Sequence, residues 1–192
     1  MINNSTQIKS LLKFEPGLFY FVQIFKRRKD NPDMAKDMMV IDNFYIYTEE
    51  QFDKYMPRII EICNLNNDRA YIRLNRRSDK KIALQMLSRI ASMVAAEQYN
   101  VKNVYNSIAG EYHAEEDKTW IIDIDSKDNK QILQIKLDID SCMPFGTDKI
   151  VAEIPTKNGI HLITKPFDLR TFKDKYEIDI HKDNPTILYS PQ

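Results

Sequence analysis

The stretch that decides the fold class is "WIIDIDS", which spans residues 120–126. Apolar and acidic residues alternate in it, and successive side chains of a β-strand point to opposite faces. The pattern therefore predicts a half-buried strand with Ile122 and Ile124 in the core. Asp123 and Asp125 are predicted side by side on the other face.

The rest of the second half is also mostly extended. Short apolar runs bounded by polar or turn residues predict further strands over "KIVAEIPT", "GIHLITKPF", "YEIDIHKD" and "TILYS", with a short helix over "DLRTFKDKY". One stretch between them, "QILQIKLDID", fits two structures. Its apolar residues alternate as in a strand, while Ile132, Ile135 and Ile139 also fit a helix capped by Ser126, and periodicity leaves both open.

The first half combines strands with amphipathic helices. The runs "LFYFVQIFK" and "VIDNFYIY" predict the two strands of a hairpin. Thr48, with Gln51 three residues later, forms a capping box and predicts the start of a helix. A strand over "AYIRLNRRS" follows, and Ser78 caps a second helix. We therefore expect an α+β fold, with a mainly antiparallel sheet and packed helices.

Length and composition fit one globular domain. A chain of 192 residues can bury a sizeable core, and we expect a single domain with an N-terminal α/β unit over 1–110 and a second unit over 111–192. Lys+Arg and Asp+Glu number 28 each, so a nucleic-acid surface would need local segregation of charge. Cys63 and Cys142 lack neighbours at metal-ligand spacing, which indicates a reducing cytoplasm. Without a signal-like start or a long apolar stretch, a soluble protein with no membrane contact is expected.

The paired carboxylates are the first candidate site. Two adjacent carboxylates repel each other, and both stay ionised only when a cation compensates, so Asp123 and Asp125 are candidate ligands of a divalent metal. A solvated acidic face would give the same pattern. The pattern also recurs in "LDIDS", where Asp138 and Asp140 could replace the first pair if the ambiguous stretch is a strand.

The second candidate site lies in "IPTKNGIHLITK". Strand alternation separates His161 from its apolar neighbours, and Gly159 leaves room for a close approach of backbone or ligand. Lys157 and Lys165 add positive charge suited to phosphates. A single histidine is more often structural than a ligand. A later strand, "YEIDIHKD", adds the acid Asp179.

The ordered series "WIIDIDS", "NGIH" and "EIDI" resembles the archaeo-eukaryotic primase superfamily, which includes the primase-polymerases. The family's three motifs are an acidic strand of the form hDhD or hDhE, a small-x-His strand and a late strand with hD. Asp123 and Asp125 match the first motif, Gly159 and His161 the second, and Asp179 the third. The resemblance covers the chain from the first of these motifs to the C-terminus.

This resemblance implies an RRM-like catalytic core that follows an N-terminal α/β unit. The three acids would hold Mg²⁺ or Mn²⁺ for nucleotidyl transfer from nucleoside triphosphates on a DNA or RNA template. His161, with Gly159, Lys157 and Lys165, would bind the nucleotide. The resemblance also implies a replication partner protein and suggests template or triphosphate contacts for three arginines of the earlier strand, Arg73, Arg76 and Arg77.

Two alternatives come from other classes. In a metal-dependent nuclease, Gln134 and Lys136 would form a variant of the acid-x-Lys half-motif. In a catalytically inactive protein that binds nucleic acid or another protein, the acids are solvated and the aromatic hairpin forms core or a partner surface. The three differ in geometry, because a polymerase-like site needs the three acids together beside His161. The nuclease needs Lys136 near Asp123, and the binding protein needs neither.

Overall fold

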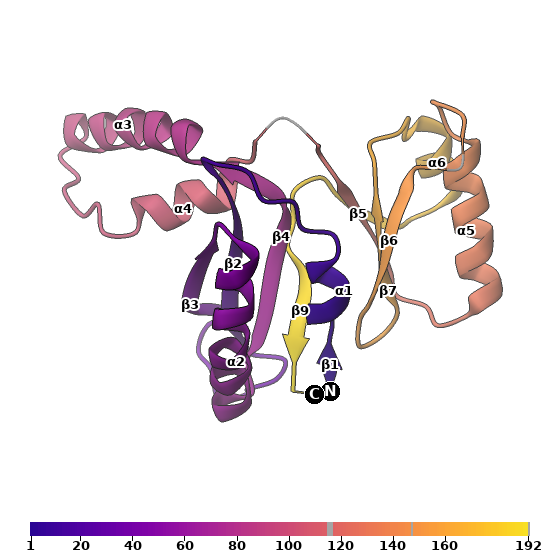
Figure 1. The fold of residues 1–192 in the computed structure, drawn as a ribbon, viewed down its shortest axis with the longest axis horizontal. Coiled ribbons are helices and arrows are strands. Elements are labelled where there is room, and N and C mark those ends of the chain that lie inside the picture. Colours follow the sequence, from indigo (N-terminus) through magenta and orange to yellow (C-terminus); the bar gives the residue numbers. More distant parts are fainter. Residues whose placement is uncertain (115–116, 147, 192) are drawn as a thin grey trace.

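The computed structural model describes residues 1–114, 117–146 and 148–191 and shows two units side by side (Figure 1). The elements within this part are, in chain order, β1 (Ile2–Asn3), α1 (Ser5–Lys9), β2 (Leu18–Arg27), β3 (Met38–Ile46), α2 (Glu49–Asn66), β4 (Arg69–Ser78), α3 (Asp79–Ala95), α4 (Val104–Glu111), β5 (Trp120–Ile124), α5 (Asn129–Ser141), β6 (Ile150–Pro155), β7 (Ile160–Thr164), α6 (Arg170–Lys175), β8 (Asp179–His181) and β9 (Thr186–Ser190). They form two mainly antiparallel sheets with packed helices, so the predicted α+β class is confirmed.

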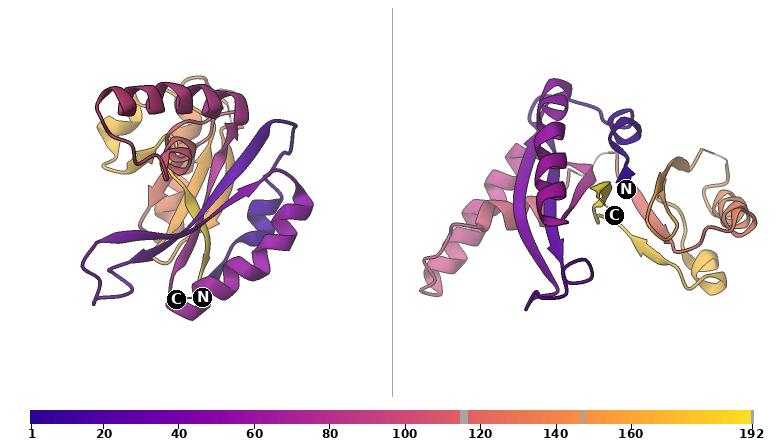
Figure 2. Two further views of the ribbon diagram at one scale, coloured as in Figure 1. Left: turned by 90° about the vertical axis from the view of Figure 1, so that its left-hand side faces the viewer. Right: turned by 90° about the horizontal axis from the view of Figure 1, so that it is seen from below.

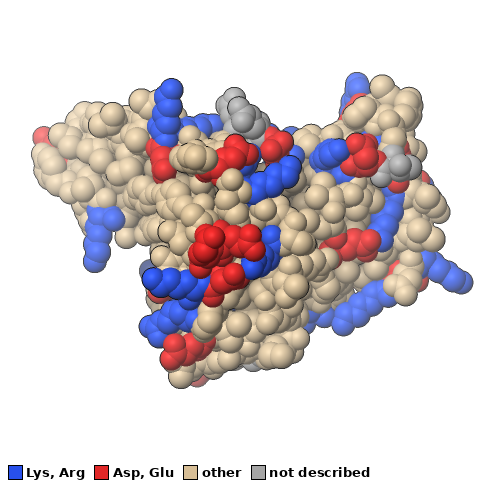
Figure 3. Space-filling model, viewed as in Figure 1, with Lys and Arg blue, Asp and Glu red and all other residues tan. Residues whose placement is uncertain are grey.

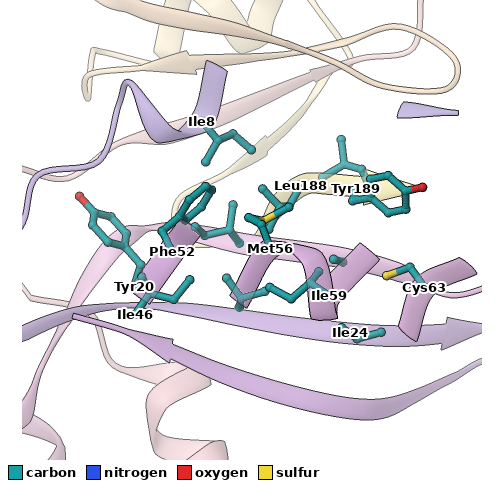
Figure 4. Close-up of a cluster of buried hydrophobic side chains, with 14 of the residues drawn as sticks. Ile8, Tyr20, Ile24, Ile46, Phe52, Met56, Ile59, Cys63, Leu188 and Tyr189 are labelled. Carbon is teal, nitrogen blue, oxygen red and sulfur yellow. The ribbon is translucent and has the colours of Figure 1, made fainter. Parts of the chain in front are cut away.

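The larger sheet has the strand order β1-β9-β4-β2-β3. Strand β2 is apolar along most of its length because helices cover both of its faces. Tyr20, Val22 and Ile24 belong to the cluster that includes α1 and α2, and Figure 4 shows several of these side chains meeting α2. Phe19 and Phe21 belong to the cluster that includes α3 and α4. Strand β2 pairs antiparallel with β3, which confirms the predicted hairpin.

The helices of this unit begin where their caps predict. The Thr48 hydroxyl accepts a hydrogen bond from the backbone N–H of Gln51 at 3.2 Å, and the Gln51 side chain accepts one from the N–H of Tyr47 at 2.8 Å. Ser78 caps α3 by accepting from the N–H of Lys81 at 3.4 Å. Local sequence therefore fixes both helix starts.

The C-terminal strand returns to the first sheet. Strand β9 pairs with β4 and with β1, and Ser190 lies opposite Ile2. The two termini consequently lie next to each other (Figures 1 and 2). The larger sheet is thus built from both ends of the chain. The predicted boundary at residue 110 assigned β9 to the second unit, whereas β9 belongs to the sheet of the first.

The smaller sheet has the order β6-β7-β5-β8 and is antiparallel throughout. Its elements follow one another as β-α-β-β-α-β, and the order corresponds to the split β-α-β topology of ferredoxin-like folds and of RRM domains. Ile122, Ile124 and Leu162 pack in one cluster with α5 and α6, which cover the outer face of this sheet (Figure 1).

The ambiguous stretch forms helix α5. Asp128, two residues after the predicted cap, accepts a hydrogen bond from the N–H of Lys130 at 2.9 Å. The helical set of apolar residues is the buried one: Ile132, Ile135 and Ile139. Asp138 and Asp140 therefore do not share a strand face, and the idea that they replace the pair in β5 is wrong.

The inner face of the smaller sheet packs against the first unit. Ile121, Ile154 and Ile163 join the same buried cluster as Ile8 and Leu188 of the first unit. Because Asp123 follows Ile121 by two residues, its side chain lies on this inner face. The acidic strand face is thus placed at the junction between the two units.

A buried polar side chain of β4, Asn75, joins the two units by hydrogen bonds. The Asn75 side-chain N–H group donates to the carbonyl oxygens of Thr119 and Lys182, both at 3.0 Å. Its oxygen accepts from the N–H of Thr119 at 2.7 Å. Thr119 precedes β5 and Lys182 follows β8, so Asn75 holds both the entry to the second unit and the exit from it.

Candidate active site

The candidate site is built by the register of three adjacent strands. Asp123 in the central strand β5 lies directly opposite His161 in β7 and directly opposite Asp179 in β8. Directly paired residues of antiparallel strands project on the same face with their Cβ atoms about 4.5–5.5 Å apart. The structure therefore brings together one residue from each of the three motifs predicted to converge.

His161 is held between two side chains. Its Nε2 lies 3.4 Å from Oδ1 of Asp123, and its Nδ1 lies 2.8 Å from the hydroxyl of Thr186 in β9. The His161 side chain is only 14% exposed. It points toward the first unit, between the sheets, and links them through β9.

The Asp123 carboxyl group is kept ionised by its surroundings. The hydrogen bond from His161 lowers its pKa, burial opposes that effect, and the nearby imidazoles of His161 and His181 add a smaller lowering. His181 shares this face because it follows Asp179 by two residues in β8. These contacts favour the ionised form of Asp123, which lies directly opposite the carboxylate of Asp179.

The order Thr186, His161, Asp123 has the connectivity of a hydrolase triad, but it cannot work as one in this conformation. Thr186 is 0% exposed, so its hydroxyl oxygen cannot reach a substrate. A nucleophile must have access to the group that it attacks. The contact between Thr186 and His161 therefore orients the imidazole and does not supply a nucleophile.

Gly159 allows the close contact that sets this register. A Cβ atom added at Gly159 would lie 1.8 Å from the carbonyl oxygen of Ile124 and 2.7 Å from the backbone nitrogen of Ser126. Any side chain would therefore push the start of β7 away from the end of β5. The predicted close approach at this glycine is confirmed as an approach of backbone to backbone.

The remaining predicted metal ligands are more exposed. Asp125 lies beyond the end of β5, and Asp125 and Asp179 are both exposed. Within residues 1–114, 117–146 and 148–191, no group of three or more His, Cys, Asp or Glu side chains is close enough to hold a metal ion. The pair of Asp123 and Asp179 still offers hard oxygen donors, and Mg²⁺ is commonly held by one or two carboxylates together with substrate phosphates and water. The donor set fits that mode of binding.

The two predicted lysines lie at opposite ends of β7. Lys157 is exposed in the turn between β6 and β7. Lys165 follows the other end of β7, where its Nζ lies 2.7 Å from Oδ2 of Asp148. Lys165 is four residues from His161, which corresponds to about 13 Å along a strand. The lysines therefore flank the acidic centre and do not form part of it.

The three arginines of β4 are engaged inside the protein. Arg77 is 0% exposed and donates from Nη1 and Nη2 to the two carboxylate oxygens of Asp183, at 3.0 and 2.9 Å. Arg73 donates to the carbonyl oxygen of Asp183, and burial beside Arg77 lowers its pKa to about 10. Arg76 is 6% exposed and pairs with Glu15 at 2.6 Å. Their predicted contacts with template or triphosphate stay predictions.

The alternative nuclease motif is not assembled. Gln134 and Lys136 lie on α5, which covers the face of the sheet opposite to Asp123. Lys136 pairs with Glu153 of β6. The nuclease hypothesis needs Lys136 beside Asp123, and this arrangement does not provide that contact.

Sequence reasoning missed three residues around the site: Thr186, Asn75 and Asp183. Each acts through a partner more than 20 residues away in the chain, His161 for Thr186 and Arg77 for Asp183. Neither periodicity nor a local motif carries a signal for such contacts. The packing of the two units brings these residues to the junction, and for Thr186 the return of β9 to the first sheet does so.

Comparison with known proteins adds no relative, since no family model, no curated protein and no solved structure matches this chain. Among the described residues, no helix combines the length and apolar character needed to cross a lipid bilayer. The evidence on function therefore consists of the chain's own residues and their arrangement.

Proposed function

We propose that this protein is a metal-dependent nucleotidyltransferase of the primase or primase-polymerase type. The observation that carries the proposal is the register of β7, β5 and β8, which sets His161, Asp123 and Asp179 in one row on one face. The β-α-β-β-α-β topology of the second unit supports it, since an RRM-like core is what the resemblance implies.

Each residue of the row has a distinct role in this proposal. His161 fixes one oxygen of Asp123, which leaves the second oxygen for a ligand. Asp179 presents its carboxylate from the neighbouring strand. Mg²⁺ or Mn²⁺ bound there with a nucleoside triphosphate would stabilise negative charge during in-line transfer to a strand end. In this proposal Asp125, exposed after β5, contributes a further oxygen.

The proposal names partners as well as a reaction. Nucleoside triphosphates are the substrates, a DNA or RNA strand is the template, and a replication protein is the proposed macromolecular partner. The reducing cytoplasm is the proposed location, and both Cys63 and Cys142 are free thiols in the structure.

A melting experiment tests the proposal first. Mn²⁺ with a nucleoside triphosphate should raise the melting temperature of the wild type, and the variant Asp123→Asn with Asp179→Asn should lose that rise. Asp174→Asn is the matched control, because it removes an exposed acid on α6, which packs on the face of the sheet opposite to Asp123. A primer-extension assay on a templated oligonucleotide then tests for activity. Equal shifts in wild type and double variant, with no extension product, would refute the proposal.

A second candidate is a catalytically inactive relative that binds nucleic acid or protein. Leu84, Leu87 and Val94 on α3 are 58%, 70% and 50% exposed, and the arm formed by α3 and α4 projects from the body (Figure 1). The hairpin of β2 and β3 contributes exposed apolar side chains as well. Phe19 and Phe21 of β2 are completely buried, whereas Met38, Met39 and Val40 of β3 are 55%, 47% and 46% exposed. Retention of oligonucleotide binding by the double variant, without synthesis in the wild type, would favour this candidate.

A further inference from the structure

A cleft lies between the two units, near the end of β7 away from Asp123. Its volume is about 540 Å³, which falls within the range of small-molecule sites. Both units line it: Leu74 and Arg76 come from β4, and Ile163 and Lys165 come from β7 and the segment after it. The structure thus places two predicted phosphate-binding residues, Arg76 and Lys165, in one cleft that contains none of the motif acids.

Four basic side chains line this cleft: Lys13, Arg76, Lys118 and Lys165. Exposed carboxylates already balance two of them. Arg76 pairs with Glu15 and with Asp117, and Lys165 pairs with Asp148.

The other two basic side chains, Lys13 and Lys118, are available to bind an anionic ligand. Within the described part of the chain, neither Lys13 nor Lys118 has an acidic side chain within ion-pair distance. Figure 3 shows basic and acidic side chains interleaved over one face of the molecule, so a local excess of this kind differs from the general surface. Lysine ammonium groups are common ligands of phosphate.

Buried polar side chains fix the backbone of both lysines. The Tyr20 hydroxyl accepts from the N–H of Lys13 at 2.8 Å and donates to its carbonyl oxygen at 3.2 Å, and Tyr20 is 3% exposed. On the other side, Asn75 is 5% exposed and binds Thr119, the residue after Lys118. Both lysine side chains therefore extend from anchored backbone, an arrangement that reduces the entropy lost on binding.

The rest of the lining is mostly apolar. Leu11, Leu74, Val151, Ile163 and Pro166 contribute to it, together with Tyr20, Thr119 and the acid Asp117, which pairs with Arg76. A flat ring can pack on such a surface while its phosphates meet the lysines at the rim. Nucleotides combine these two features in one molecule.

We propose that this cleft binds a nucleotide through its phosphates without a metal ion, at a site separate from the acidic row. The nucleotide comes either as a free nucleoside triphosphate or as part of a single strand. Because the cleft contains neither Asp123 nor Asp179, its binding does not depend on those acids. Occupancy would also bridge the two units across the segment that joins them.

Isothermal titration calorimetry provides the readout. The single tryptophan is not used, because Trp120 does not line the cleft and packs near Phe167 on the outer face of the smaller sheet. Titrations with ATP, tripolyphosphate, adenosine and a ten-residue oligothymidylate are made in EDTA. We expect ATP or the oligonucleotide to bind more tightly than tripolyphosphate or adenosine, and the tighter of the two identifies the source of the nucleotide.

The variant Lys13→Glu with Lys118→Glu should weaken this binding by about tenfold or more, because two phosphate contacts become repulsive. Both side chains are exposed, so the variant should fold, and an unchanged melting temperature checks this. Lys54→Glu with Lys130→Glu is the charge-matched control, since neither residue lines the cleft. Asp123→Asn with Asp179→Asn should bind as the wild type does.

Three results would overturn the inference: no binding in EDTA, equal weakening by the control variant, or loss of binding in the double aspartate variant. Metal-dependent binding that the lysine variant retains would leave the nucleotidyltransferase proposal standing while the cleft proposal fails. Metal-free binding that the lysine variant loses, without any metal-dependent shift, would give the reverse outcome. The two proposals therefore fail separately.

Discussion

Two contacts at the junction between the units, Arg77 with Asp183 and His161 with Asp123, differ in how many of their hydrogen-bonding atoms are engaged. Arg77 and Asp183 have side chains that are 0% and 20% exposed, and both carboxylate oxygens accept from the guanidinium. His161 and Asp123 are 14% and 31% exposed, and only one carboxylate oxygen is engaged at 3.4 Å. Both carboxylate oxygens of Asp183 are already bound by the guanidinium, whereas Asp123 has a second oxygen that can bind a ligand.

This difference separates structural residues from candidate functional ones. Arg77 also donates to the carbonyl oxygens of Ala109 and Asn75, at 2.6 and 2.7 Å, so its donors are directed at protein groups. Its contacts join β4, α4 and the segment after β8. Asp123 and Asp179 instead lie directly opposite each other, and within the described part of the chain neither forms an ion pair with a lysine or an arginine.

The largest expected effect on stability concerns the buried pair of Arg77 and Asp183. Arg77→Met should lower the free energy of unfolding by about 3–5 kcal/mol, because it leaves the Asp183 carboxylate without its partner. Urea unfolding followed by circular dichroism measures this loss. The double variant Arg77→Met with Asp183→Asn should lose less than the two single losses together, since the two residues are coupled. A loss below about 1 kcal/mol for Arg77→Met would contradict a structural role.

The next effect concerns the backbone contact that aligns the site. Gly159→Ala should destabilise the protein by about 1–3 kcal/mol, because its Cβ atom would lie 1.8 Å from the Ile124 carbonyl oxygen, and backbone atoms must move. It should also weaken the metal-dependent shift, since β7 carries His161.

Gly110→Ala is the matched control for that variant. Gly110 lies in α4, and its added Cβ atom would meet nothing closer than Nη2 of Arg73 at 3.9 Å. Alanine favours a helix over glycine by about 1 kcal/mol, so this variant should be as stable as the wild type or more stable. Equal losses for both variants in urea unfolding would show that the approach at Gly159 has no special role.

A smaller effect tests the half-exposed pair through pH. The hydrogen bond from His161 keeps the pKa of Asp123 below its ordinary value of 3.8 in the folded state. Stability from this contact is therefore present above about pH 4 and is lost as the pH falls through the lowered pKa. Asp123→Asn should cost about 1 kcal/mol at pH 6, and the difference from the wild type should shrink toward pH 3.

Urea unfolding at pH 3, 4, 5 and 6 checks this pH dependence. Asp168→Asn gives a comparison, because Arg170 lowers the pKa of Asp168 to about 2 at the protein surface, away from the junction. A constant difference between wild type and Asp123→Asn over this range would mean that the imidazole contact does not stabilise the ionised carboxylate.

The sequence predicted those parts of the molecule that depend on neighbours in the chain. The caps at Thr48 and Ser78 and the alternation in β5 and β7 involve local geometry, and the structure confirms them. The close approach at Gly159 is also confirmed, but the sequence did not identify its partner, Ile124 of β5. Alternation also put Asp123, His161 and Asp179 each on one face of its own strand. It did not show that these strands are adjacent, and that adjacency is what makes a site.

The parts that could not be predicted depend on long-range burial. The stretch that forms α5 matched both periodicities, and packing of Ile135 and Ile139 against the second sheet decides for the helix. Arginine is rarely fully buried, so the complete burial of Arg77 could not be inferred without its partner Asp183, which lies 106 residues further along the chain. The return of β9 likewise depends on pairing between the two ends of the chain.

The smallest expected effect on stability concerns an exposed ion pair, Lys165 with Asp148. Lys165 and Asp148 have side chains that are 55% and 80% exposed and lie 2.7 Å apart. Exposed ion pairs contribute about 0–1 kcal/mol, so Lys165→Met should change the free energy of unfolding by less than about 0.5 kcal/mol. If the cleft binds nucleotide phosphates, the same variant should weaken ATP binding measurably in EDTA. A large loss of stability with unchanged binding would mean that Lys165 belongs with Arg77, among the residues that hold the two units together, and not among those that are available to a ligand.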